Sequence, residues 1–92
     1  MSEMQRMFRR NEDVAFQSLL DQVVIVNVRA REVHVLNGTA SRIWSLLERE
    51  TTAADLARAL REEYAVEAAQ AEAEVESFLQ ELEEKGLTAA SP

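Results

Sequence analysis

The sequence predicts an α+β fold in which a three-stranded antiparallel sheet is followed by three helices. Residues 11–36 contain three short stretches with the hydrophobic pattern of strands, and in the last of them apolar and polar residues alternate. From residue 38 onward, apolar residues instead recur at every third or fourth position, which is typical of helices. The change of period falls at Asn37-Gly38, so the expected element order is β-β-β-α-α-α.

The three strands are expected at residues 11–20, 22–28 and 31–36. The second stretch, QVVIVNV, is the most uniformly apolar, and we therefore expect it at the centre of the sheet. A first turn is expected near Asp21. The second turn, at Arg29-Ala30, contains neither Gly nor Asn-Gly, so its type and register are not predicted. The arrangement is that of an antiparallel meander.

The first two helices have recognisable N-termini. The first is expected over residues 38–49, with Asn37 as the N-cap whose side chain accepts from free backbone N–H groups. In the second, Thr52 followed by Asp55 in TTAADL forms a capping box, and the apolar spacing carries the helix to about Tyr64.

The third helix is expected to begin near Glu67 or Ala68 and to end at Gly86. Its apolar stripe consists of Ala71, Val75, Phe78, Leu79 and Leu82. Leu87 is expected to fold back onto the core. The domain predicted from these elements spans residues 13–88, with a flexible segment at 1–12 and a frayed tail at 89–92.

Composition limits the possible functions. The chain has 92 residues and no cysteine, and its longest aliphatic run, Val23 to Val26, is far too short to cross a bilayer. The N-terminal ten residues have no apolar segment typical of a secretory signal, so a cytoplasmic location is expected. The single histidine, His34, lies in a predicted strand, and no residues have the spacing of a metal site or a nucleophile motif. We therefore expect no enzymatic activity, metal or cofactor.

The formal charge of −7 is unevenly distributed. Residues 67–85 contain seven glutamates and one lysine. Because nucleic-acid affinity depends largely on cations that neutralise phosphates, this acidic segment argues against nucleic-acid binding. The usual role of such a glutamate run is a solvated helix face, and attraction of a basic peptide is the alternative.

Two resemblances follow from the helices. TTAADLARAL and FLQELEEKGL resemble parts of a winged helix-turn-helix domain, in which the β-hairpin wing normally follows the third helix. Here the strands precede the helices. This order, with VLNGTASRIWSLL, TTAADLARALREEY and EVESFLQELEEKGL, resembles the pyrroloquinoline-quinone biosynthesis protein D (PqqD) family, which provides peptide recognition elements to pathways of ribosomally made, post-translationally modified peptides (RiPPs). Val33, His34 and Glu74 depart from the residues that are frequent in relatives.

The resemblance implies that the leader segment of a precursor peptide adds as a strand to the third strand and packs against the third helix. The implied binding residues are Arg31, Glu32, Val33, His34, Val35, Leu36, Ala71, Glu72, Glu74, Val75, Phe78, Leu79 and Leu82. Val75 and Phe78 are expected in the groove, with Leu79 and Leu82 pointing more to the interior. Glu72, Glu74 and Glu76 are expected to attract basic leader residues.

The implied partner is a separate processing enzyme, because the chain has no room for one of its own. A lasso-peptide leader peptidase is favoured over a radical S-adenosylmethionine (SAM) maturase of the quinone-cofactor type. The first two helices, near Arg42, Arg49, Arg58 and Arg61, are the expected docking surface. A small dimerisation domain, in which the same strand edge pairs with a second copy, is the alternative, and a DNA-binding regulator is a weaker one.

Overall fold

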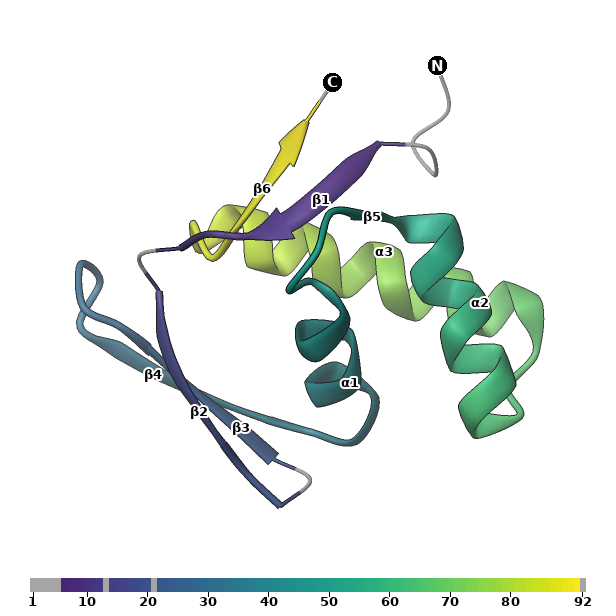
Figure 1. Cartoon of the computed structure of the whole chain (residues 1–92), viewed down its shortest axis with the longest axis horizontal. Coiled ribbons are helices and arrows are strands. Elements are labelled where there is room, and N and C mark those ends of the chain that lie inside the picture. The colour runs from purple at the N-terminus through teal and green to yellow at the C-terminus, as the bar shows by residue number, and fades with distance from the viewer. Residues whose placement is uncertain (1–5, 13, 21, 92) are drawn as a thin grey trace.

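The computed structural model describes residues 6–12, 14–20 and 22–91. Its elements are β1 (Met7–Arg10), β2 (Ala15–Leu19), β3 (Gln22–Asn27), β4 (Glu32–Asn37), α1 (Gly38–Leu46), β5 (Thr51–Thr52), α2 (Ala53–Tyr64), α3 (Ala68–Glu84) and β6 (Thr88–Ser91). The strands form two sheets, ordered β2-β3-β4 and β5-β1-β6. Figure 1 shows α1 beside the β2-β3-β4 sheet, α2 on the far side of α1, and α3 extending from α2 back toward the β3–β4 turn.

The predicted antiparallel meander is confirmed, with β3 in its centre. The turn between β3 and β4 needs no glycine because Asn27 organises it. The Asn27 Oδ1 atom accepts a hydrogen bond from the backbone N–H of Ala30 (3.2 Å), and Arg31 has a left-handed φ of 57°. The expected turn at Asp21 lies outside the described residues.

The first helix is shorter than expected. It ends at Leu46, whereas the sequence predicts residue 49. The chain leaves the helix early because Thr51 and Thr52 pair with Phe8 and Met7 as strand β5. The predicted capping role of the Asn37 side chain lies outside what the structure describes, although its backbone directly precedes α1.

The ends of the other two helices follow the sequence signals. The Thr52 hydroxyl accepts a hydrogen bond from the backbone N–H of Asp55 (3.1 Å) and so caps α2. At the end of α3, the N–H of Leu87 donates to the Leu82 carbonyl (2.9 Å) and the N–H of Gly86 donates to the Glu83 carbonyl. These bonds form a Schellman motif, in which Gly86 has a φ of 72°. Leu87 is buried, as predicted.

The sequence predicts a flexible segment at residues 1–12 and a frayed tail at 89–92, but strands β1 and β6 form in these regions. Met7–Arg10 instead pairs with Thr88–Ser91 along four residue pairs. The pairing joins the two ends of the chain, and such a long-range contact leaves no local signal in the sequence. Phe8 is buried in the core as a result.

The core surrounds α1, and Trp44 is fully buried in its centre. The Arg10 guanidinium lies over the Phe16 ring (4.5 Å to its centroid) and the Trp44 ring (5.5 Å), and it donates to the Trp44 carbonyl. Burial lowers the pKa of Arg10, and the charge of Glu48 opposes this effect. The cluster therefore attaches the exposed strand β2 to the core.

Candidate functional site

Strand β4 lies at an edge of its sheet and has two different faces. His34 and Leu36 lie opposite the buried Ile25 and Val23 of β3, so they face the interior and are only partly exposed. Val33 and Val35 point the other way and are 63% and 61% exposed. An edge strand offers unpaired backbone N–H and C=O groups along its outer side, which is where another strand can pair.

A groove next to the end of β4 separates the first turns of α1 from α3. We call it the α1–α3 groove, and its volume is about 410 Å³. It is lined by Thr39, Ala40, Ile43, Ala73, Glu74, Ser77, Phe78 and Glu81. Because Glu74, Phe78 and Glu81 follow each other at four and three residues, they form one stripe along α3. The groove thus combines apolar walls with a carboxylate on each side of Phe78.

The apolar stripe predicted on α3 is divided between the core and the groove. Ala71, Val75, Leu79 and Leu82 are all buried in the core. Val75, which the sequence analysis places in the groove, is 0% exposed. Its position one turn from both Ala71 and Leu79 directs it to the interior. Phe78 is only partly buried and lines the α1–α3 groove.

The predicted acidic residues of α3 lie on different sides of the helix. Glu74 lines the α1–α3 groove, whereas Glu76 lies beside Phe8 and Leu79 in a hollow on another side of α3. Glu72 is exposed and lines neither. Helical geometry gives the reason, since residues two positions apart point about 200° apart around the axis.

At the start of β4, Arg31 and Glu32 are exposed. The Glu32 Oε1 atom lies 3.5 Å from His34 Nε2, which is buried and has no hydrogen-bond partner among the described residues. His34 is thus a partly buried strand residue. The part of the chain that the structure describes contains no group of three or more His, Asp or Glu residues that could hold a metal ion.

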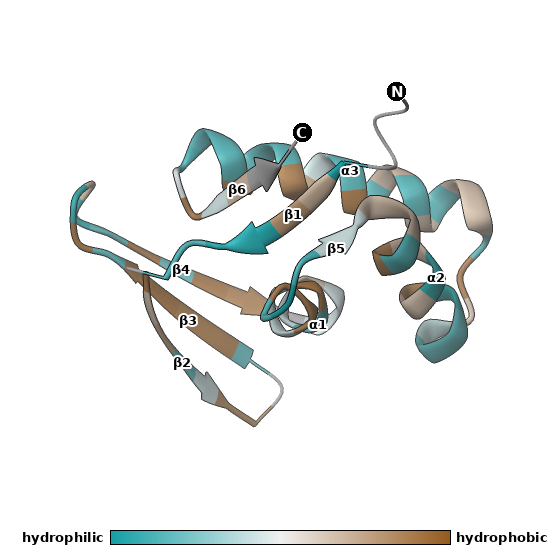
Figure 2. Ribbon diagram, turned by 45° about the horizontal axis from the view of Figure 1, so that its top comes forward, coloured by the Kyte–Doolittle hydropathy of each residue, from teal (hydrophilic) through white to brown (hydrophobic). Residues whose placement is uncertain are grey.

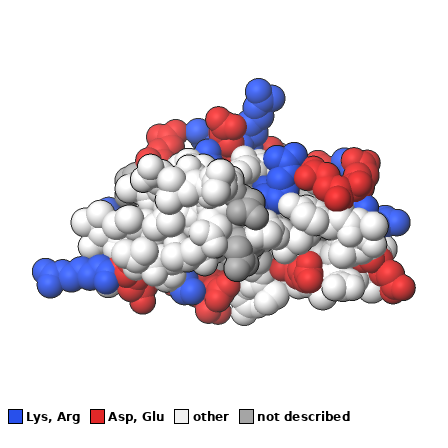
Figure 3. All heavy atoms as spheres, turned by 90° about the horizontal axis from the view of Figure 1, so that it is seen from below, with Lys and Arg blue, Asp and Glu red and all other residues white. Residues whose placement is uncertain are grey.

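The outward side of the β2-β3-β4 sheet is apolar. We call it the outer sheet face, and the cross-strand register places Ala15, Gln17, Leu19, Gln22, Val24, Val26, Val33 and Val35 on it. Figure 2 shows hydrophobic residues along β3 and β4. The left part of Figure 3, where this sheet lies, is largely free of charged side chains. An exposed apolar patch of this size is often, but not always, functional on a soluble protein.

The arginines of the first two helices are a less suitable docking surface than the sequence analysis expects. Arg42 already forms a two-bond ion pair with Glu63 (2.8 and 3.0 Å), and this hydrogen bonding raises the pKa of Arg42. Arg58 is paired with Asp55. The charges of Arg42 and Arg58 are therefore largely satisfied within the chain.

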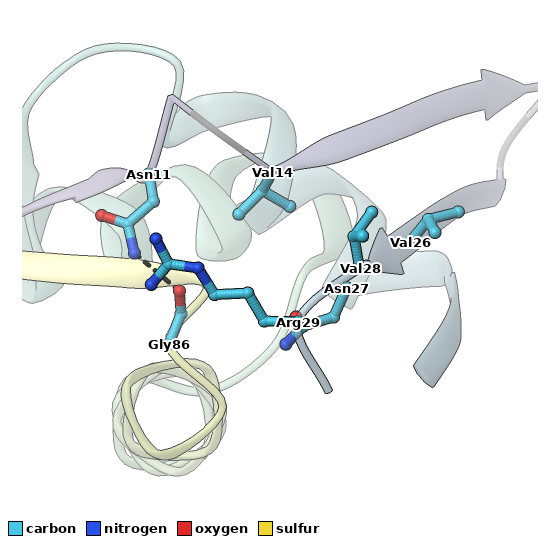
Figure 4. A pocket seen from close by; sticks show the side chains of 7 residues that line it. All are labelled: Asn11, Val14, Val26, Asn27, Val28, Arg29 and Gly86. Carbon is cyan, nitrogen blue, oxygen red and sulfur yellow. Dashed lines mark hydrogen bonds between the residues drawn. The ribbon is translucent and has the colours of Figure 1, made fainter. Parts of the chain in front are cut away.

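A further pocket of about 460 Å³ lies where the β3–β4 turn meets the end of α3. It is lined by Asn11, Val14, Val26, Asn27, Val28, Arg29 and Gly86, and Figure 4 shows the Asn11 amide bonded to the Gly86 carbonyl. That bond is 2.7 Å long, and Asn27 Nδ2 donates to the neighbouring Lys85 carbonyl (3.0 Å). The side chains here tie the sheet and the β1–β2 connection to α3.

The family model for coenzyme PQQ synthesis protein D (PqqD) matches residues 22–87, from the start of β3 to the residue after the Schellman glycine. The chain belongs to the PqqD family. The matched range contains β4, α1 and α3, so every element of the site described above lies within the PqqD region.

Two solved structures of bound relatives are similar to this PqqD-family chain. TbiB1, solved in complex with the TbiA(beta) leader peptide, is 29% identical with a TM-score of 0.80, and the match covers 87% of this chain and 93% of TbiB1. A lasso peptide synthetase B1, complexed with its leader peptide, is 30% identical with a TM-score of 0.76, covering 92% and 98% of the two chains.

The PqqD truncation of PqqCD from Methylobacterium extorquens, described as a functional and stand-alone RiPP recognition element, also has this fold. It is 19% identical with a TM-score of 0.74, covering 96% of this chain and 93% of that one. No curated protein sequence matches the chain. Among the described residues, no helix has the length and apolar character needed to cross a membrane.

Six residues of the groove are missing from the sequence-based set: Thr39, Ala40, Ile43, Ala73, Ser77 and Glu81. Ser77 and Glu81 carry a local signal, because they lie one residue and one turn from Phe78 on α3. Thr39 and Ala40 carry none, since their position opposite α3 depends on how α1 packs.

Proposed function

We propose that this protein binds the leader segment of a ribosomally made precursor peptide as an added strand on β4. The observation that carries the proposal is the open edge of β4 leading to the α1–α3 groove, which contains the partly buried Phe78. The leader complexes of the TbiB1 and lasso B1 relatives support it. The protein acts by binding alone, and the modification chemistry belongs to another enzyme.

Affinity in this arrangement comes mainly from side chains. A backbone hydrogen bond contributes about 1 kcal/mol net, and fixing one peptide residue costs about as much. Pairing with β4 therefore fixes the register. An apolar leader side chain that becomes buried against Ile43 and Phe78 contributes roughly 1.5 to 3 kcal/mol. Two or three such anchors contribute roughly 3 to 9 kcal/mol before the entropic costs of association, so they supply most of the affinity.

The carboxylates of the groove favour a basic residue in the leader. Glu74 and Glu81 lie on either side of Phe78, so a cation next to an apolar anchor meets one of them. Glu81 is already near Lys85 Nζ (3.4 Å), whereas the hydrogen-bond partner of Glu74 among the described residues is the neutral Gln70 amide, at 3.5 Å. Glu74 is therefore the stronger attractor. This attraction tunes specificity and weakens with salt.

Binding is tested by titrating the protein with the leader segment of the precursor encoded beside its gene. Ala73→Arg places a bulky charge in the groove at an exposed position, so the fold should persist while affinity falls at least about tenfold. Ala69→Arg, one turn away on the same helix and also exposed, is the matched control and should bind normally. Equal binding by both variants would contradict the proposed groove.

The same experiment separates leader binding from dimerisation. If β4 pairs with a second copy, the apparent mass rises with protein concentration and the leader has no effect on it. If β4 accepts the leader, the protein keeps its monomer mass and gains one peptide. A concentration-dependent dimer without leader binding would overturn the proposal.

We further propose that the bound leader is delivered to a separate processing enzyme that docks on the outer sheet face. A lasso leader peptidase is favoured by the lasso B1 relative, and a radical SAM maturase is the second candidate. Val33 and Val35 belong to the outer sheet face and also to β4, so a protein covering this face lies directly beside the leader.

The size of the outer sheet face and the net charge of the protein favour an enzyme over a second copy. Three strands of five or six residues cover roughly 300 Å², whereas each partner of a stable dimer buries about 800 Å². Two copies with a net charge of −7 each would also repel one another. The outer sheet face is therefore suited to a transient contact with the enzyme, which the leader strengthens by binding both proteins.

Docking is tested with Val26→Lys, which changes the outer sheet face on central strand β3 and leaves the β4 edge intact. Leader affinity should be unchanged, and leader removal by the peptidase encoded in the same cluster should slow at least about tenfold. Ala54→Lys, at an exposed position on α2, is the control. Normal processing with Val26→Lys would exclude this docking surface.

A further inference from the structure

Asn27 connects the two walls of the proposed peptide site. It is the last residue of β3 and pairs with Glu32, the first residue of β4. Its side chain donates from Nδ2 to the carbonyl of Lys85, the C-cap of α3, and accepts at Oδ1 from Ala30 in the turn that leads to β4. One amide group therefore holds the start of β4 and the end of α3 at the same time.

The other end of the site is closed by the chain itself. β4 runs directly into α1 at Gly38, and the first turns of α1 form a wall of the α1–α3 groove. At that end, covalent connection and the buried Ile43 fix the distance between β4 and the helices. At the β3–β4 turn there is no such connection, and the Asn27–Lys85 hydrogen bond bridges a part-buried gap between the sheet and α3.

We propose that Asn27 is a positioning residue that fixes the distance between β4 and α3 and thereby keeps the site ready for a peptide. This inference rests on the proposed function. Without the bond, the β3–β4 turn moves relative to α3, and the site has its binding width for only part of the time. The apparent dissociation constant then equals the intrinsic constant divided by the fraction of molecules that have the binding width.

The substitution Asn27→Asp isolates the bond to α3. The carboxylate still accepts from the Ala30 N–H, so the turn persists, but it has no donor for the Lys85 carbonyl and repels that oxygen. Asn11→Asp is a matched control, because Asn11 makes the same kind of bond to the next carbonyl, that of Gly86, from the β1–β2 connection. The control removes one bond to the end of α3 without releasing β4.

The distance is measured directly with spin labels. The chain contains no cysteine, so cysteines introduced at the exposed Glu32 and Glu84 give a unique label pair on β4 and α3. The distribution of label distances should broaden with Asn27→Asp and stay narrow with Asn11→Asp. Equal distributions in the two variants would overturn the inference, whether or not a peptide binds.

Leader titration supplies the second measurement. The dissociation constant should rise about three- to tenfold with Asn27→Asp, the range expected for one hydrogen bond, and stay close to wild type with Asn11→Asp. A broadened distance with unchanged affinity would overturn the role of Asn27 in binding. If the wild-type protein binds no leader, the proposed function fails, while the label distances still decide whether Asn27 holds β4 to α3.

Discussion

Val75 and Phe78 lie three residues apart on α3, yet Val75 is completely buried and Phe78 is partly exposed in the α1–α3 groove. A separation of three residues rotates a side chain by about 300° around the helix axis, or 60° short of a full turn. This angle places one residue in the core and the other at its border. The two residues therefore have different expected roles, stability for Val75 and peptide contact for Phe78.

Substitution of Val75 by Ala should lower the free energy of unfolding by roughly 1 to 3 kcal/mol, because it removes buried methyl groups and leaves a cavity. Urea unfolding, followed by the fluorescence of the single tryptophan, Trp44, measures this change. Leader affinity of the folded protein should be nearly unchanged. If Val75→Ala kept the stability of the wild type but lost much of its leader affinity, Val75 would instead belong to the binding surface.

Phe78→Ala should have little effect on stability and a large effect on leader affinity, the reverse of Val75→Ala. Phe78 is only partly buried, so its removal costs less stability than its size alone suggests, while the groove loses its aromatic wall. We expect leader affinity to fall by roughly tenfold, in line with the burial of one apolar contact. Calorimetric titration of the folded variant checks this value, and affinity equal to wild type would contradict it.

Thr52→Ala should destabilise the protein by about 1 kcal/mol, because the N–H of Asp55 loses the hydroxyl that caps α2. Thr52→Ser keeps the hydroxyl and should retain most of the stability. Thermal unfolding of the two variants provides the comparison. If both lose the same stability, the methyl group of Thr52 matters more than the cap.

Gly86→Ala should cost about 1 kcal/mol, since Gly86 has a φ of 72° in the Schellman motif that ends α3. Apart from Gly86 and its two chain neighbours, no heavy atom of the described residues lies within 4 Å of an added Cβ, so the cost comes from the backbone and not from a clash. Gly86→Asn should cost less, because Asn adopts left-handed conformations more readily. Denaturant unfolding that ranks Ala as equal to or better than Asn would contradict this explanation.

Arg10→Lys should loosen the attachment of β2 to the core. Lysine keeps the charge but lacks the planar group that lies over both Phe16 and Trp44. We expect a loss of about 1 kcal/mol in unfolding free energy and a shift in Trp44 fluorescence in the folded state. Arg9→Lys, at an exposed neighbouring position, should change neither.

The sequence by itself determined the elements whose signals are local. The apolar stretch at residues 22–28 identified the central strand, Thr52 and Asp55 marked the start of α2, and Gly86 marked the end of α3. The order of these elements also led to the PqqD family. Each signal depends on residues within about one or two turns of each other, which is the range over which backbone periodicity and capping act.

Only the tertiary structure decided the features that depend on distant parts of the chain. Met7–Arg10 becomes a strand because it pairs with Thr88–Ser91. Periodicity placed Val75 and Phe78 on one apolar stripe, and the packing of α3 against the rest of the molecule assigned one to the core and the other to the groove. The hydrogen bond from Asn27 to the Lys85 carbonyl likewise joins β3 to a helix end 58 residues later. Such contacts are selected by the shape of the whole fold, because no local pattern specifies which surfaces will meet.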